Sequence, residues 1–239
     1  MEYPEELLIL AGGLGTRLRP LNAALPKAMM SLGGAPILHW KLFEARLQGF
    51  SKVLLSVGYQ SELIEEYISS NNFDDLEIEF VKDRVPAQGT AAAVRQALTM
   101  SEGEGICITY GDSLTFCSRE QVQSLSQGPN TTITYSRFVS PGSSPNVERL
   151  QNGTVVYGNL ATNPKHVEHG LLAIRAKDLE QLEVSSSLPE LLTRLSSQGL
   201  LAGIEVFTTY WEIGTPASYH EVAQRFERRE HEWFFQELS

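Results

Sequence analysis

The residues best suited to chemistry lie near the N-terminus, where residues 10–20 run LAGGLGTRLRP. Glycines let backbone N–H groups approach a phosphate closely, and Arg17 adds positive charge where a phosphoryl group carries negative charge. Leu18 stands where a dinucleotide-binding loop has its third glycine, and no Gly-Lys-Ser/Thr follows as in a P-loop. With Lys27 close behind, the segment predicts a phosphate-binding loop of another type.

The elements that must position this loop are short apolar runs that alternate with helical patterns. Leu7–Ala11 predicts a buried strand that leads straight into the loop, and ligands of open α/β sheets bind at the carboxyl ends of strands. Further strands are predicted at 28–32, 53–57, 76–80, 105–110 and 201–207, and helices at 36–49, 61–70, 89–100, 189–197 and from 216 onward. The alternation predicts an α/β sheet with helices on both faces.

The middle of the chain is rich in short strand patterns, at 131–138, 146–150, 154–157 and 170–175. No low-complexity linker separates this part from the rest of the chain. We therefore expect one domain over residues 1–239, with a strand-rich insertion or lid at about 131–175.

The charge and the cysteine content of the chain limit the classes of binding partner and the cellular compartment that we expect. The 239 residues carry 19 Lys+Arg against 29 Asp+Glu, a formal charge of −10, and hold only two cysteines. A chain this acidic, without a basic run, is unsuited to nucleic acid. No apolar run reaches the roughly 20 residues of a membrane span, and the acidic start is unlike a signal peptide. We expect a cytoplasmic protein without nucleic-acid or membrane partners.

The opening segment resembles the signature of the sugar-1-phosphate nucleotidyltransferases, also called nucleoside-diphosphate-sugar pyrophosphorylases. That signature runs Leu-Ala-Gly-Gly-x-Gly-Thr-Arg-Leu-x-Pro and is followed at a fixed distance by Pro-Lys, here Pro26-Lys27. One departure is Asn22, where the family usually has Thr. The resemblance implies a Rossmann-like mixed, mainly parallel sheet flanked by helices.

Other motifs extend the resemblance to about residue 226. Gly89-Thr90 is similar to the second glycine motif of the family, and Gly111-Asp112 resembles its metal-binding aspartate. Residues 211–216, WEIGTP, resemble its C-terminal motif, with Glu212 where Asp is common, as in one bacterial branch. Residues 146–148, NVE, and 169–175, HGLLAIR, also look like that branch.

The resemblance implies that an NTP and a sugar 1-phosphate are converted to an NDP-sugar and pyrophosphate. Arg17 is expected to hold the departing pyrophosphate, Lys27 to lie near the α-phosphate or the attacking phosphate, and Asp112 and Glu212 to bind Mg²⁺. The nucleotide-binding residues implied are Leu10, Ala11, Gly12, Gly13, Gly15, Thr16, Gln88, Gly89 and Thr90. The sugar-binding residues implied are Gly111, Asn146, Glu148, Glu168 and Gly170.

Two departures leave the substrates open. Arg84 occupies the approximate position at which many family members read the base with Glu or Gln, and Asp83 or Gln88 is a possible substitute. Residues 157–161, YGNLA, lack the lysine that grips the sugar phosphate, so Lys165 or Arg175 is a possible replacement. The divergence allows an unusual hexose or heptose phosphate as acceptor.

Two other functions remain in view. Cytidylyltransferases of phosphocholine or phosphonates resemble the same opening, although the full GTRLRP string favours sugars. A catalytically silent regulatory paralogue would fit the missing lysine, but it would have no reason to keep both cations and both acids.

The C-terminal stretch 231–238, HEWFFQEL, raises a question of assembly. Its three adjacent aromatic residues either dock on the core of the same chain or form a dimer contact. We favour docking, and a monomer and a homodimer both remain open.

Overall fold

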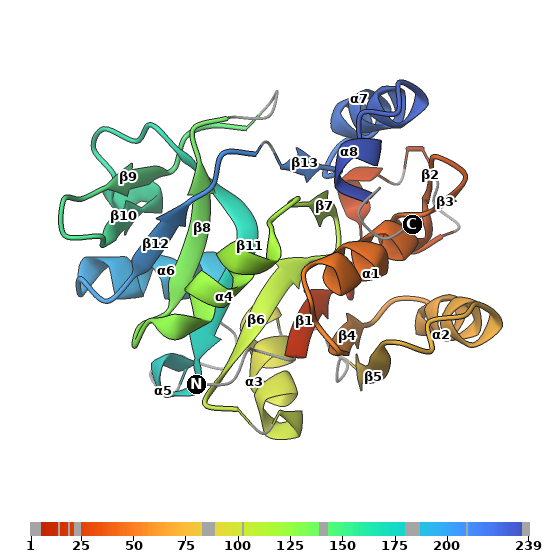
Figure 1. The fold of residues 1–239 in the computed structure, drawn as a ribbon, viewed down its shortest axis with the longest axis horizontal. Coiled ribbons are helices and arrows are strands. Elements are labelled where there is room, and N and C mark those ends of the chain that lie inside the picture. The colour runs from red at the N-terminus through yellow and green to blue at the C-terminus, as the bar shows by residue number, and fades with distance from the viewer. Residues whose placement is uncertain are drawn as a thin grey trace.

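The computed structural model describes residues 6–13, 15–18, 20–21, 25–82, 89–101, 103–138, 143–179, 187–208 and 210–235. The strands are β1 (Glu6–Leu10), β2 (Ser31–Leu32), β3 (Ala35–Pro36), β4 (Lys52–Val57), β5 (Glu77–Lys82), β6 (Gly105–Tyr110), β7 (Ser113–Leu114), β8 (Thr132–Ser136), β9 (Val147–Arg149), β10 (Val155–Tyr157), β11 (Val167–Arg175), β12 (Ala202–Glu205) and β13 (Trp211–Glu212). The helices are α1 (Ile37–Leu47), α2 (Ser61–Ser70), α3 (Thr90–Met100), α4 (Arg119–Gln127), α5 (Ala176–Leu179), α6 (Leu188–Ser197), α7 (Pro216–Glu227) and α8 (Glu232–Phe235) (Figure 1).

A central sheet organises the molecule. Among the described residues it has seven strands in the order β12-β8-β11-β6-β1-β4-β5. Only β11 runs against its neighbours within that part of the chain, because β11 pairs antiparallel with both β6 and β8 while the other neighbouring pairs are parallel. The expected mixed, mainly parallel sheet is confirmed.

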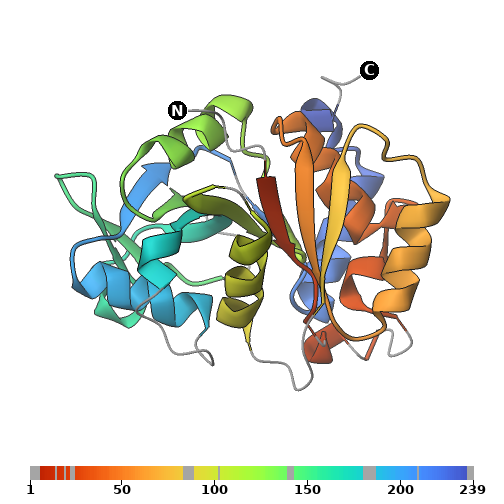
Figure 2. The same cartoon turned by 90° about the horizontal axis from the view of Figure 1, so that it is seen from below.

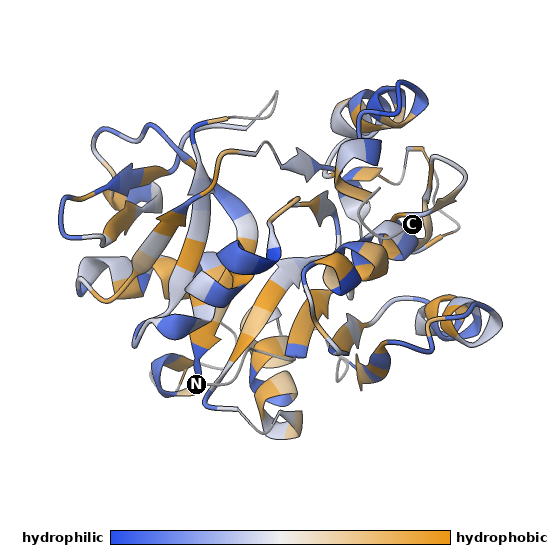
Figure 3. Cartoon of the chain, viewed as in Figure 1, coloured by the Kyte–Doolittle hydropathy of each residue, from blue (hydrophilic) through white to orange (hydrophobic). Residues whose placement is uncertain are grey.

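Strand β1 shows why an unbroken apolar run suits the middle of such a sheet. Leu7 and Ile9 enter one hydrophobic cluster, beside α1, α2 and α4, while Leu8 enters the cluster on the other face, beside α3 and α6. Successive side chains of a strand point to opposite faces, so both faces of β1 need apolar residues. Figure 2 shows α4 on one side of the sheet and α3, α5 and α6 on the other, and Figure 3 shows apolar residues concentrated in central strands such as β6.

Most predicted elements appear within one or two residues of their expected limits, but β11 begins three residues before the predicted strand 170–175, and another predicted strand is not part of the sheet. Residues 28–32 do not form a strand of the sheet, because Lys27–Met29 is a 3₁₀ turn and only β2 follows it. Strand β2 pairs with β3 across Gly33 and Gly34, whose φ angles of +58° and +91° suit a tight hairpin. The turn matters for the site because it carries Lys27.

The strand-rich segment 131–175 divides between two sheets. Strands β8 and β11 belong to the central sheet, whereas β9 and β10 pair with each other as a separate two-stranded ribbon. The part of this segment that stands apart from the main sheet is therefore the β9–β10 ribbon.

The C-terminal aromatic residues dock on the chain itself, as favoured from the sequence. Phe234 and Phe235 of α8 are buried in a third cluster with Phe226 of α7, and Phe235 contacts Trp40 and Phe43 of α1. Trp233 points outward and is 57% exposed. In the described part of the chain, no helix has the length and apolar character needed to cross a membrane.

Candidate active site

Two pockets lie side by side at the carboxyl end of the parallel strands and share Arg17, Tyr110 and Asp112. The first pocket has a volume of about 370 Å³ and the second about 360 Å³. The first is lined by Leu10, Ala11, Gly12, Gly13, Gly15, Thr16, Arg17, Lys27, Ala28, Ser56, Gly89, Thr90, Tyr110, Gly111, Asp112 and Gly214. The second is lined by Arg17, Tyr110, Asp112, Ser113, Ser144, Asn146, Val167, Glu168, Gly170, Pro189, Tyr210 and Glu212.

The glycine-rich loop forms one wall of the first pocket because β1 ends at Leu10, between β4 and β6 in the sheet. Gly15 has a φ of +55°, and a Cβ there would stand 3.1 Å from the Cβ of Lys27. A larger residue at position 15 would therefore combine an unfavourable backbone conformation with crowding. Glycine at this point lets the lysine stem lie against the loop.

Lys27 and Asp112 both line the first pocket and form an ion pair, in which the Lys27 ammonium contacts Oδ2 of Asp112. Both side chains are partly exposed to the pocket, by 13% and 32%. The 3₁₀ turn after Pro26 presents Lys27, and the end of β6 presents Asp112. The sequence predicted both groups, and the fold brings them together across 85 residues of chain.

Asp112 and Glu212 are brought together by a short antiparallel ribbon. Glu212 of β13 pairs with Ser113 of β7, and the Ile213 backbone N–H donates to the Asp112 carbonyl at 2.7 Å. Figure 1 shows β7 and β13 beside one another above the end of the sheet. Both carboxylates line the second pocket, together with Glu168.

Hydroxyl, amide and carboxylate groups line the second pocket. The Glu168 backbone N–H donates to Asn146 Oδ1 at 2.9 Å, and the Gly170 backbone N–H donates to Glu168 Oε1 at 2.8 Å. Gly170 has a φ of +87° in the bulge of β11, and a Cβ there would stand 3.2 Å from the Ser113 hydroxyl. This set of donors and acceptors suits a ligand rich in hydroxyl groups.

The pKa of Glu168 is raised to about 7, mainly by burial and also by the nearby charges of Glu212 and Asp112, while the hydrogen bond from the Gly170 N–H acts in the opposite direction. The neighbouring His169 is pushed the other way, because burial lowers its pKa to about 4. Its Nε2–H donates to the Thr208 carbonyl at 2.9 Å, as expected for a neutral ring. Two adjacent side chains of β11 are thus both neutral near pH 6.

The raised pKa of Glu168 predicts a specific pH dependence of stability. The Glu168 carboxyl releases its proton near pH 4.5 in the unfolded chain and near pH 7 in the folded one. The stability that the protonated carboxyl contributes to the folded state is therefore fully present below pH 4.5 and is lost as the pH rises to 7. The amide of Glu168→Gln does not titrate and so does not lose this stability. Between pH 4.5 and 7 we therefore expect the free energy of unfolding of Glu168→Gln to rise by up to ~3 kcal/mol relative to that of the unsubstituted protein. Urea titrations with a chelator present measure it, and parallel curves for the two proteins would contradict it.

The site contains residues that motif analysis missed. Ser56 at the end of β4 lines the first pocket, Tyr110 lies in both, and Tyr210 lies in the second. Tyr110 closes a buried strand directly before Gly111-Asp112, a position that signals a site wall in parallel sheets. Tyr210 immediately precedes the β13 motif, but no comparable sequence pattern marks it as a site residue.

Several expected residues lie elsewhere. Glu148 lines neither pocket, and its Oε2 accepts hydrogen bonds from the backbone N–H groups of Thr162 and Asn163, both at 3.0 Å. Arg175 donates to the carbonyls of Ser126 and Gly128, so its guanidinium serves the fold. Lys165 is exposed and outside both pockets. Gln88, with Asp83 and Arg84, falls outside the described residues.

Asp112 and Glu212 are the residues that could hold a metal ion. Within the described ranges, no group of three or more His, Cys, Asp or Glu side chains is arranged to bind one by itself. Two carboxylates are nevertheless the usual protein share of a Mg²⁺ site, in which water and substrate phosphates supply the other ligands. The Lys27 ammonium contacts Oδ2 of Asp112, and the Ser143 hydroxyl donates to Oε2 of Glu212. Each carboxylate can still bind further partners through its remaining lone pairs. The donor set therefore fits Mg²⁺.

Gly214 provides a test of how closely Glu212 must be held. A Cβ at this position would stand 2.5 Å from Glu212 Oε1 and 3.4 Å from Arg17 Nη2. We expect Gly214→Ala to displace the carboxylate and lower turnover by about 10²-fold, while the melting temperature changes by only a few degrees. Steady-state rates and thermal melts of the two proteins measure both. Turnover within twofold of the unsubstituted protein would contradict the placement of Glu212.

Comparisons with known proteins agree with this geometry. Residues 7–141 match the family described as the MobA-like NTP transferase domain. A D-glycero-alpha-D-manno-heptose 1-phosphate guanylyltransferase of Aneurinibacillus thermoaerophilus is 37% identical over 109 residues, 46% of each chain. An N-acetylmuramate alpha-1-phosphate uridylyltransferase of Neisseria meningitidis is 28% identical over 108 residues, 45% of this chain and 47% of that one. These matches span about half the length of the relatives.

Solved structures extend the likeness of fold over nearly the whole chain. The inositol-1-phosphate CTP transferase of T. maritima superposes with a TM-score of 0.78 at 18% identity, covering 95% of this chain and 97% of that one. HddC from Yersinia pseudotuberculosis gives 0.77 at 20% identity, covering 92% and 99%. Because the family match covers more than half of the 239 residues, the chain belongs to the MobA-like NTP transferase family.

Proposed function

We propose that the protein joins a nucleoside triphosphate to a sugar 1-phosphate and releases pyrophosphate. The observation that carries the proposal is the pair of adjoining pockets that share Arg17, Tyr110 and Asp112. One pocket has the walls of a phosphate site and the other those of a polyol site. The sugar 1-phosphate guanylyl- and uridylyltransferases among the relatives support the same reaction.

In the first pocket the triphosphate lies against the glycine-rich loop. Backbone N–H groups of Gly12, Gly13 and Gly15 face the phosphates, and Arg17 holds the pyrophosphate that leaves. Gly89 and Thr90, at the start of α3, border the nucleoside end. Gln88 reads the base in this proposal.

The chemical step is an in-line displacement. An oxygen of the sugar phosphate attacks the α-phosphorus and forms a new P–O bond, while the bond to the bridging oxygen of the β-phosphate breaks and pyrophosphate leaves. Both reactants are anions, so orientation and cationic charge supply most of the rate. Lys27 lines the first pocket and contacts Asp112, which lines both pockets, so we place its charge beside the reacting phosphates, where it reduces the repulsion.

Asp112 and Glu212 hold Mg²⁺ in this proposal. When bound, Mg²⁺ neutralises phosphate charge and orients the phosphate oxygens. The carboxylates themselves need a fixed separation, which the β7–β13 pairing supplies.

The second pocket binds the acceptor through Asn146, Glu168 and Gly170, whereas Gly111 lines the adjoining first pocket. A protonated Glu168 donates one hydrogen bond and accepts others, as a sugar hydroxyl requires. Arg17 is the cation that lines this pocket among the described residues, but it already holds the leaving pyrophosphate. We therefore assign the acceptor phosphate to Lys27, whose partner Asp112 lines both pockets. Glu148 is assigned to the 162–163 turn rather than to the sugar.

A cytidylyltransferase acting on a non-sugar phosphate is the second candidate. The T. maritima structure of the same fold is an inositol-1-phosphate CTP transferase, and inositol presents the same ring of hydroxyls as a sugar. The silent paralogue is disfavoured, because the Lys27–Asp112 pair and Glu212 would have no task in it. A cytoplasmic location and a monomer or homodimer remain part of the proposal.

The experiment is pyrophosphate release with Mg²⁺ from ATP, CTP, GTP, UTP and dTTP, each against hexose 1-phosphates, heptose 1-phosphates, inositol 1-phosphate and phosphocholine. Lys27→Ala runs beside it as the blank. One productive sugar pair, silent in the blank, supports the proposal and identifies base and sugar. Pyrophosphate release only with inositol 1-phosphate or phosphocholine would show that the acceptor is a non-sugar phosphate. Nucleotide binding without pyrophosphate release from any pair would support the catalytically silent paralogue.

A further inference from the structure

A buried ion pair lies behind the active site, in α1. Lys41 and Glu44 are each 1% exposed, and Lys41 Nζ stands 2.6 Å from Glu44 Oε2. Neither residue lines either of the two active-site pockets. Burying two charges costs much of what their attraction gains, so such a pair contributes little to stability unless it makes further contacts. The partners of this pair therefore indicate its role.

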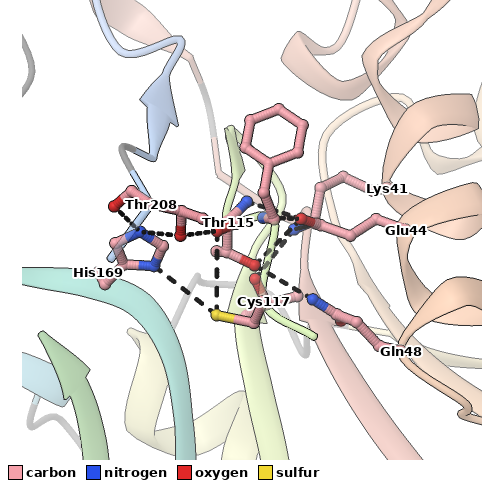
Figure 4. Close-up of polar contacts among 9 residues, drawn as sticks. Lys41, Glu44, Gln48, Thr115, Cys117, His169 and Thr208 are labelled. Carbon is pink, nitrogen blue, oxygen red and sulfur yellow. Dashed lines mark hydrogen bonds and ion pairs between the residues drawn. The ribbon is translucent and has the colours of Figure 1, made fainter. Parts of the chain in front are cut away.

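The partners flank Asp112 on both sides. Lys41 Nζ donates to the Thr109 hydroxyl at 3.0 Å, three residues before Asp112. Glu44 Oε1 accepts the backbone N–H groups of Thr115 and Phe116, each at 2.7 Å, three and four residues after it. Figure 4 shows both side chains reaching from the helix to the end of β6 and the following segment. One helix thus fixes the two ends of the turn that carries Asp112.

The segment that Lys41 and Glu44 hold includes β7, and β7 pairs with the strand that carries Glu212. Ser113, between the two anchored ends, pairs with Glu212, and the ring of Phe116 packs 4.7 Å from that of Trp211 in an edge-on arrangement. Phe116 has a φ of +51°, a conformation that a residue with a side chain adopts only when its surroundings hold it. The Glu44 carboxylate is one group that holds it, since it binds the Phe116 N–H.

The network continues toward the second pocket. Cys117 Sγ lies 3.8 Å from His169 Nδ1, and His169 bonds to the Thr208 carbonyl. His169 stands between Glu168 and Gly170, which line that pocket. Gln48 adds a contact from α1 to the Thr115 hydroxyl at 3.3 Å.

We infer that Lys41 and Glu44 are positioning residues, which fix the 109–116 backbone so that Asp112 and Glu212 face a single divalent cation. The inference rests on the proposed metal site. The carboxylate of Glu44 is the central group, because it accepts two backbone N–H groups that the β7 turn leaves without a strand partner. Lys41 balances its charge and anchors the β6 end.

Two double variants separate this role from simple stability. Lys41→Met with Glu44→Gln removes both charges and keeps an oxygen that accepts the Thr115 and Phe116 N–H groups. Lys41→Met with Glu44→Leu removes the charges and the acceptor together. Exchanging a buried ion pair for neutral groups of similar volume is often tolerated, so the first variant is expected to fold. Leu125→Ala, a core deletion in α4 outside both pockets, is the control for destabilisation.

The measurement is the binding of Mn²⁺ with inorganic pyrophosphate, followed by water proton relaxation. We expect the Glu44→Leu double variant to bind Mn²⁺ about 10-fold more weakly, and the Glu44→Gln double variant and Leu125→Ala to stay within about threefold of the unsubstituted protein. Equal affinity in the two double variants would overturn the inference. Equal weakening in Leu125→Ala would also overturn it, since general loosening would then explain the effect.

Asp112→Asn separates this inference from the proposed function. If Asp112→Asn keeps full Mn²⁺ affinity, the proposed metal site is wrong and the positioning role falls with it. If Asp112→Asn loses Mn²⁺ while the Glu44→Leu double variant keeps it, only the positioning role is wrong. Should that double variant not fold, Lys41→Met with Glu44→Met carries the test, because methionine has nearly the shape of glutamine but no oxygen to accept the two N–H groups. Mn²⁺ binding about 10-fold weaker is expected, and unchanged binding would overturn the role.

Discussion

Asp112→Asn is expected to lower kcat/KM for pyrophosphate release by about 10³-fold while leaving the fold intact. Asp112 is the one acid that lines both pockets in the described residues, and it contacts Lys27 there. The amide keeps the size of the carboxylate but loses the charge that a cation requires. It also leaves Lys27 without its ionic partner, so one substitution disturbs two groups at the reacting phosphates.

The measurement is the initial rate of pyrophosphate release with the substrate pair that the panel identifies, over a range of Mg²⁺ concentrations. Glu66→Gln is the matched control, because Glu66 is an exposed acid on α2, outside both pockets, and its exchange for an amide is chemically the same. The control should keep its rate within twofold. An Asp112→Asn rate within a few fold of the unsubstituted protein would exclude a metal-binding role for Asp112.

Lys27→Ala is expected to lower kcat by about 10²-fold to 10³-fold, with a smaller change in KM for the nucleotide. Lys27 lines the first pocket, where Gly15 allows the side-chain stem of Lys27 to pack against the loop. Charge on the phosphates shifts most at the transition state, so a cation beside the reacting phosphorus favours that state over the bound substrate. The loss should therefore appear in kcat rather than in binding.

Lys27→Arg serves as the conservative comparison, since it keeps the charge in a longer and planar side chain. We expect it to recover part of the lost kcat, because charge is retained while position is not. Equal rates for Lys27→Ala and the unsubstituted protein would show that Lys27 is a structural partner of Asp112 alone. A change confined to nucleotide KM would assign Lys27 to ground-state binding.

The sequence alone predicted the position of a candidate site residue where that residue directly follows a recognisable strand. Residues 10–20 have a composition that few folds other than a phosphate loop require, and the apolar run before them predicts the strand that aims the loop. Asp112 follows the same logic at the end of β6. The positions of these residues were predictable because parallel strands present their carboxyl ends at one edge of the sheet, while their roles in binding stay predictions.

Other features depend on pairing that no local pattern encodes. Strand β7 has only two residues, and it becomes a strand because β13 pairs with it from 98 residues away. Lys41 and Glu44 are spaced like an ordinary exposed helix pair, and only tertiary packing buries them. The division of 131–175 between two sheets follows from the antiparallel insertion of β11 between β6 and β8, which strand periodicity does not reveal.

The most direct test of the central claim follows the phosphorus atoms of the triphosphate. The productive NTP is labelled with ³²P at the α-position in one reaction and at the γ-position in another, and products are separated after a single turnover. The proposed reaction places the α-label in a nucleotide sugar and the γ-label in pyrophosphate, with both products absent in Asp112→Asn. Recovery of the γ-label in orthophosphate or on the sugar would contradict it, because the protein would then cleave the triphosphate at its terminal phosphate.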